Sequence, residues 1–212
     1  LQNQIEKVSD HLFEKGAMVI PGEIGYDLNY YSIKLTSIAS GNTLAQFTTD
    51  TVLTGGSSGV KARIIGTDAL SGSDPDTIYV KYNDSGTNNT NSAFTHGETI
   101  TGTNSDSVSL SAVVATCHTG SAAQVEEGTY YINGYHVQVS KQTILLDKYT
   151  NTPSYRVGLV VTESFVTPND DATLNDNATG SSNVNAPGAH RFKIDLTLTK
   201  KTISTTEDSN FI

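Results

Sequence analysis

The stretch HRFKIDLTLTKKT, from His190 to Thr202, carries the clearest structural pattern in the chain. Its large apolar residues occupy every second position, at Phe192, Ile194, Leu196 and Leu198. Because successive side chains of a β-strand point to opposite faces, this period of two predicts a strand with one face in the core. A strand with one solvated face in turn favours an antiparallel sheet.

Shorter apolar runs of the same kind recur along the chain, separated by Gly, Ser, Thr, Asn and Asp. Such spacing by turn residues is typical of β proteins, and the plentiful Thr, Val, Ile and Tyr favour pleated sheets. Residues 17–37 predict two strands around a Pro-Gly turn, and Asn133-Gly134 predicts a two-residue type I′ hairpin turn. The apolar run at 154–167 predicts a central strand buried on both faces. We therefore expect a mostly β fold.

Changes of composition along the chain predict four parts. Residues 1–16 form a short N-terminal helix. Residues 17–39 and 121–200 together form an antiparallel β-sandwich-like host domain. Residues 40–120, which are richer in small polar residues, form a small inserted β-barrel-like module. Within it, VLTGGSSGVKARII and TITGTNSDSVSLSAVV resemble each other, and each predicts a hairpin with a Gly- and Ser-rich tip. Residues 201–212 are a tail or the start of a following domain.

The N-terminal helix carries an apolar seam, formed by Leu1, Ile5, Val8 and Leu12 in a 4-3-4 spacing. Gly16 is a suitable stop for the helix. Two interpretations remain open: the seam packs on the chain's own β domain, or it is the end of a parallel coiled coil between copies. An isolated helix this short is marginal in water, so either partner would be needed. The four seam residues are our candidates for an oligomer interface.

Composition argues against several classes of function. The net charge is −9 and the Lys and Arg residues are scattered, whereas a nucleic-acid groove needs a basic stripe. No apolar run approaches the roughly 18 residues of a membrane span. The single cysteine, Cys117, excludes an intrachain disulfide. No nucleophile-elbow motif occurs and the five His lie in unrelated contexts, so we expect no catalytic residues and no cofactor.

Because the chain begins at Leu1 rather than Met, we expect a piece of a longer or processed polypeptide.

A polar segment, Asp170–Arg191, separates the last two predicted strands and shows neither a helix nor a strand period. It is a disordered linker, a metal loop or an ordered structural loop. Its Asp and Asn residues offer the oxygen ligands that calcium takes, but the EF-hand order is absent, so we expect no metal site. Another Gly-rich stretch, TGGSSG at Thr54–Gly59, lacks the Lys-Ser/Thr ending of a phosphate loop and predicts a hairpin tip.

Two groups of residues carry a resemblance to a known family. The first group is Gly128, Tyr131, Gly134, Tyr135 and Val137; the second is Asp171, Leu174, Asp176, Ala178, Gly180, Asn183, Pro187, Gly188, Ala189 and Arg191. Together they resemble the strand pair and the Asp-x-x-Leu-x-Asp-x-Ala-x-Gly and Pro-Gly-Ala-x-Arg loop of tailed-bacteriophage structural proteins. These are baseplate and tail-fibre-associated polypeptides whose shared domain long lacked an assigned function. The resemblance covers residues 5–39 and 121–200, and not residues 40–120.

The resemblance implies a non-enzymatic virion component of the phage tail, at the baseplate or the base of a fibre, assembled in the host cytoplasm. It implies other tail or baseplate proteins as partners and a homo-trimer as the oligomer. It also favours an ordered loop, in which Arg191 pairs with Asp171 or Asp176, Leu174 holds the loop down, and Pro187-Gly188 closes it. The alternatives are a carbohydrate- or receptor-binding module, with a host surface glycan as partner, and a polysaccharide depolymerase.

Overall fold

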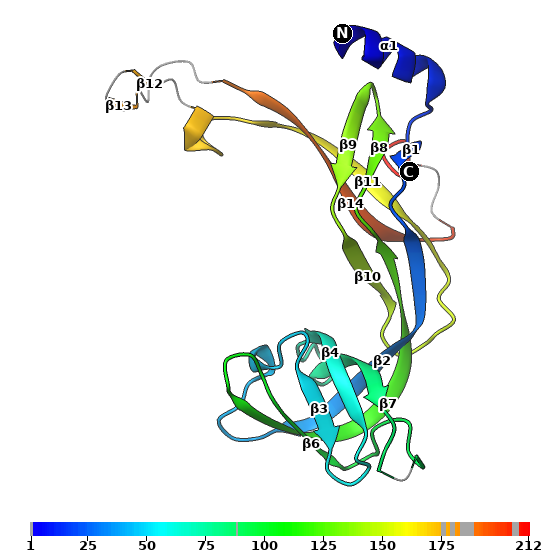
Figure 1. The fold of residues 1–212 in the computed structure, drawn as a ribbon, viewed down its shortest axis with the longest axis vertical. Coiled ribbons are helices and arrows are strands. Elements are labelled where there is room, and N and C mark those ends of the chain that lie inside the picture. Colours follow the sequence, from blue (N-terminus) through cyan, green and yellow to red (C-terminus); the bar gives the residue numbers. More distant parts are fainter. Residues whose placement is uncertain (1, 88, 175–176, 179–180, 183–188, 205–207) are drawn as a thin grey trace. The chain divides into compact units, whose positions relative to one another are not determined.

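The chain is mostly β in the computed structural model, which describes residues 2–87, 89–174, 177–178, 181–182, 189–204 and 208–212 (Figure 1). The helical elements of the described residues are α1 (Gln2–Leu12) and the short 3-10 helices η1 (Leu44–Gln46) and η2 (Ala172–Leu174). The strands are β1 (Met18–Ile20), β2 (Ile24–Ile38), β3 (Val52–Gly55), β4 (Lys61–Asp68), β5 (Thr77–Asp84), β6 (Thr99–Thr103), β7 (Ser109–Val125), β8 (Gly128–Ile132), β9 (Tyr135–Val139), β10 (Gln142–Asp147), β11 (Tyr155–Val166), β12 (Asn177–Ala178), β13 (Ser181–Ser182) and β14 (Arg191–Thr202).

The chain divides into two compact units, each built from more than one segment. Unit 1 comprises residues 1–25, 123–144 and 154–212, and unit 2 comprises residues 26–122 and 145–153. The chain therefore enters and leaves unit 2 twice.

Unit 2 is a closed barrel. Its strands follow one another in the order β7-β2-β5-β4-β3-β6, and β6 pairs again with β7, which closes the ring. The two similar stretches of the sequence form the hairpins β3–β4 and β6–β7, and β3 also pairs with β6. Closure satisfies the backbone hydrogen bonds that free sheet edges would leave open.

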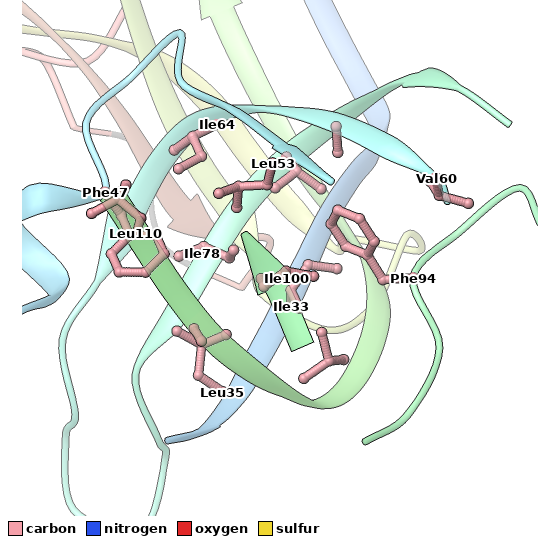
Figure 2. Packing of buried hydrophobic residues seen from close by; sticks show 14 residues of the cluster. Ile33, Leu35, Phe47, Leu53, Val60, Ile64, Ile78, Phe94, Ile100 and Leu110 are labelled. Atoms are coloured by element: carbon pink, nitrogen blue, oxygen red, sulfur yellow. The ribbon is translucent and has the colours of Figure 1, made fainter. Parts of the chain in front are cut away.

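The core of unit 2 consists of the inward residues of these strands. Ile33 faces Ile78 across the β2–β5 pair, and both are completely buried. Phe47, after η1, and Phe94, in the loop before β6, add their rings to the same cluster (Figure 2). Burial of apolar area on this scale stabilises the barrel by about 25 cal/mol per Å².

Unit 1 has a small sandwich-like core between two sheets. One sheet has the order β1-β8-β9, and the other pairs β11 with β14. Side chains of both sheets meet in one buried cluster, which includes Tyr130 and Ile132 from the first sheet and Leu159, Val161 and Leu196 from the second. The fold class expected from the sequence is therefore confirmed.

The observed boundaries differ from the expected ones. Residues 26–39, 121–122 and 145–153 lie in unit 2, whereas the sequence predicts all three ranges in the host domain. The reason is pairing: β2 is hydrogen-bonded between β7 and β5, and therefore belongs to the barrel. At the end of the chain, Leu159 of β11 exchanges backbone hydrogen bonds with Ile212 at 2.9 and 3.0 Å. Residues 210–212 thus extend the sheet of unit 1.

Two local expectations also need correction. Helix α1 ends at Leu12 rather than at residue 16, because Gly16 donates its N–H to the carbonyl of Tyr131 on β8 at 2.8 Å. In β14, Leu196 is buried as expected, but Phe192 is 42% exposed. The core-facing part of β14 therefore begins after Phe192, at Ile194.

Candidate assembly surface

Helix α1 is held to its own unit by a polar and aromatic face. The Ser9 hydroxyl lies 3.4 Å from Nε2 of His136 on β9, and the Tyr131 hydroxyl of β8 donates to the Asp10 carboxylate. The Phe13 ring, just after the helix, packs against Tyr131 and His136 with centroid distances of 5.8 and 6.3 Å. These contacts fasten α1 to the β8–β9 hairpin, beside which it lies in Figure 1.

The apolar seam of α1 lies on a different face. Ile5, Val8 and Leu12 are 52%, 56% and 66% exposed, whereas Ser9 is only 4% exposed. At 100° per residue, the three aliphatic side chains lie on one side of the helix and the docking contacts on another. Leu1 lies outside the described residues. The helix therefore packs on its own unit, but its seam takes no part in that packing.

An aromatic patch, formed by Tyr135, Phe165 and Phe192, is also exposed on unit 1. Phe165 and Phe192 face each other across the β11–β14 pair, with ring centroids 5.5 Å apart. Tyr135 of β9 packs on Phe192 at 5.6 Å. All three are exposed, Phe165 by 66%. The patch could not be predicted from the sequence, because the alternation of apolar residues alone predicts that Phe192 points into the core.

The two ends of the polar segment between β11 and β14 are hydrogen-bonded to each other. Leu174 is buried, at 6% exposed, and its carbonyl accepts a hydrogen bond from the N–H of Ala189 at 3.0 Å. The Asp171 carboxylate accepts from the N–H and the hydroxyl of Thr173, at 2.9 and 2.7 Å. Leu174 thus occupies the buried position that the resemblance implied for it.

The resemblance implies that Arg191 pairs with Asp171 or Asp176, and of these two only Asp171 lies within the described residues. Arg191 is exposed. Hydrogen bonds from the hydroxyl and the N–H of Thr173 lower the pKa of Asp171, and the charge of Arg191 makes a smaller contribution. Asp176, Pro187 and Gly188 lie outside the described residues. Within the described part of the segment, Arg191 therefore acts on Asp171 as a nearby surface charge.

The TGGSSG stretch forms a hairpin tip that binds a carboxylate of the chain itself. Oε2 of Glu98 accepts from the N–H groups of Ser57 and Ser58 at 3.2 and 3.0 Å, and Oε1 accepts from the N–H of Thr95 at 2.5 Å. Burial alone would raise the pKa of Glu98, but these bonds and the one from the Ser58 hydroxyl together lower it. An anion-binding turn is therefore present, and Glu98 fills it.

A metal cluster and a nucleophile next to a base are two arrangements that would indicate catalytic chemistry. No three His, Cys, Asp or Glu side chains among the described residues lie close enough together to hold a metal ion. Ser9 and His136 approach each other, but the Ser9 hydroxyl is buried under α1, where a substrate could not reach it. The seam of α1 and the aromatic patch expose apolar side chains on unit 1. In the described part of the chain, no helix is both long and apolar enough to cross a membrane.

Comparison with known proteins identifies a family. A family model described as "Domain of unknown function (DUF4815)" matches residues 70–210, which is more than half of the chain. The chain therefore belongs to this family. The matched range includes residues 70–120 of the expected insertion, which the resemblance had left uncovered. No curated protein and no solved structure gives a match.

Proposed function

We propose that this member of the DUF4815 family is a structural component of a bacteriophage tail, at the baseplate or the base of a tail fibre. Two kinds of support are independent of each other. The loop and strand-pair residues resemble those of tailed-bacteriophage structural proteins. The exposed seam of α1 gives the chain a surface for assembly. Under this proposal the protein acts by binding copies of itself and neighbouring tail proteins in the virion.

The single observation that carries the assembly role is the exposure of Ile5, Val8 and Leu12. Large aliphatic side chains cost free energy in water, by about 1.5–3 kcal/mol for each one left unburied. Their heptad-like spacing suits a seam in which the same three residues of each copy meet around an axis. We propose a trimer, because tail fibres are commonly threefold. The docking contacts of Ser9 and Phe13 leave this seam available.

The test is the mass of the protein in solution, measured by light scattering for the parent chain and for Ile5→Asp. A trimer brings three Asp carboxylates together at the axis, where repulsion and desolvation should dissociate it into monomers. Lys7→Gln is the matched control, because it changes the net charge by the same amount on an exposed part of the same helix, away from the seam. It should leave the trimer intact.

Thermal unfolding followed by circular dichroism separates dissociation from misfolding. Ile5→Asp should retain a cooperative transition of the β units, whose core residues lie outside α1. A parent chain that is monomeric at all concentrations would refute the trimer. An Ile5→Asp chain with the parent's mass would show that the seam is not the interface.

A further inference from the structure

Unit 2 contains a pocket of about 380 Å³ at one end of the barrel. Its polar and aromatic lining comes from β2, β5 and the loop that follows β5, and consists of Asp27, Asn29, Tyr31, Lys81, Tyr82 and Ser92. This volume lies within the range of about 300–1,000 Å³ that small-molecule sites occupy, and barrel mouths are a common place for such sites.

The pocket arises from a change of side-chain character along β2. Ile33 and Tyr31 point to the same face of the strand, where Ile33 is completely buried and Tyr31 packs on the edge of the core. The next positions on that face, by the period of two, are Asn29 and Asp27. The inward face thus changes from aliphatic through aromatic to polar as the strand leaves the barrel.

The floor and one wall of the pocket are held in place by aromatic contacts. The rings of Tyr31 and Tyr82 meet edge to face at 4.9 Å, and Tyr82 meets Phe94 in the same way at 5.4 Å. The Tyr82 hydroxyl accepts the N–H of Phe94 at 3.2 Å, which fixes the loop that carries Ser92. The pocket is therefore supported by the core beneath it.

The polar groups of the pocket balance in charge. Lys81 pairs with Asp27 at 2.8 Å, and the other carboxylate oxygen of Asp27 accepts the N–H of Asn29 at 3.0 Å. The lining offers a carboxylate that accepts, an ammonium that donates, and amide and hydroxyl groups that do both. A neutral ligand with several hydroxyl groups fits this mixture, because each hydroxyl donates and accepts. The Tyr rings fit its C–H faces.

We propose that this pocket binds one ring of a neutral sugar. The inference goes beyond the proposed assembly role and is independent of it, because the pocket lies in unit 2 and the seam in unit 1. The sugar ring lies against Tyr31 and Tyr82, and its hydroxyls bond to Asp27, Asn29 and Lys81. An acidic sugar is disfavoured, because its carboxylate would compete with Asp27 for the one ammonium in the lining.

The experiment is saturation-transfer NMR of the full chain with glucose, galactose, mannose, N-acetylglucosamine and N-acetylgalactosamine. Each sugar is added to about 50 mM, because a single ring in an open pocket is expected to bind with a Kd in the millimolar range. We expect transfer to the ring protons of at least one sugar. Asn29→Ala and Asp27→Asn should each weaken that binding about five- to tenfold, the effect of one lost hydrogen bond.

Asp84→Asn is the matched control, because it disrupts an exposed ion pair of the same unit, with Lys61 at 3.8 Å, outside the pocket lining. It should bind the sugar as the parent does, and so should Ile5→Asp. Urea unfolding of every variant identifies any that has lost its fold, and Asn29→Ala keeps the test valid if Asp27→Asn unfolds the chain, because Asn29 is exposed. Three results would overturn the proposal: no transfer to any of the five sugars, equal binding by the parent and the pocket variants, or tighter binding of glucuronate than of glucose.

Discussion

Replacement of Glu98 by Gln tests whether the hairpin tip of unit 2 is organised around a buried charge. Glu98 is 5% exposed, and its carboxylate accepts hydrogen bonds from three backbone N–H groups and two hydroxyls. Gln has nearly the same shape but replaces one acceptor oxygen by an NH2 donor. Whichever way the amide turns, this donor faces at least one backbone N–H.

The expected cost follows from the bonds that are lost. If the NH2 group takes the place of Oε1, the N–H of Thr95 is left without an acceptor, while the bonds of Ser57 and Ser58 lose their charge assistance. An unsatisfied buried donor costs about 1–3 kcal/mol, and a hydrogen bond to a charged group is worth about 1.5–3 kcal/mol. Because Gln retains part of these bonds, we expect the free energy of unfolding to fall by about 2–4 kcal/mol.

Urea unfolding at pH 7 measures this loss, with Glu14→Gln as the control because Glu14 is exposed. The pKa of Glu98 is lowered in the folded chain, so its charge stabilises the fold above the unfolded pKa, near 4.3. That stabilisation is lost as the pH falls through the folded pKa, and the difference between parent and Glu98→Gln should therefore shrink in acid. A loss below about 0.5 kcal/mol at pH 7 would refute the reasoning.

Two further predictions concern other polar contacts. A hydrogen bond from the Tyr149 hydroxyl, with those from Lys148 and Lys34, lowers the pKa of Asp74 to about 2. The charge of Asp74 therefore stabilises the fold above about pH 4, and this stabilisation is lost as the pH falls through 2. The urea midpoint of Asp74→Asn should lie below that of the parent at pH 7, and the two midpoints should converge near pH 2. The Gln142 amide donates to the carbonyl of Leu196 and accepts the N–H of Leu198, both at 2.8 Å, so Gln142→Ala should lower the free energy of unfolding by about 1–3 kcal/mol. Faster amide hydrogen exchange at Leu198 checks the second prediction, and unchanged exchange would contradict it.

The sequence by itself determined the local structure, because turns and alternation depend on neighbouring residues. Asn133 and Gly134 have φ angles of 46° and 97°, as the predicted type I′ turn requires, and they join β8 to β9. The two similar stretches became hairpins, because their turn residues bring adjacent strands together. The position of α1 and the strand at 191–202 were also predicted, to within a few residues at the ends of the helix.

The tertiary structure decided which distant segments pair and which apolar residues remain outside. Alternation predicts that one face of a strand is buried, but it does not say where along the strand burial ends, so Phe192 was placed in the core. Alternation also does not show which strands pair with each other. The sequence therefore did not predict that residues 26–39 and 145–153 belong to unit 2, or that residues 210–212 pair with β11.

The candidate sites show the same division. The seam of α1 was predicted because a helix repeats every few residues along the sequence. Its exposure was decided by Ser9 and Phe13, which dock another face of the helix on the β8–β9 hairpin. Glu98 and the TGGSSG tip are about 40 residues apart in sequence, and the pocket joins β2 to a loop that follows β5. Such sites depend on the pairing of strands that are distant in sequence, β3 with β6 and β2 with β5, which brings together residues that no local pattern connects.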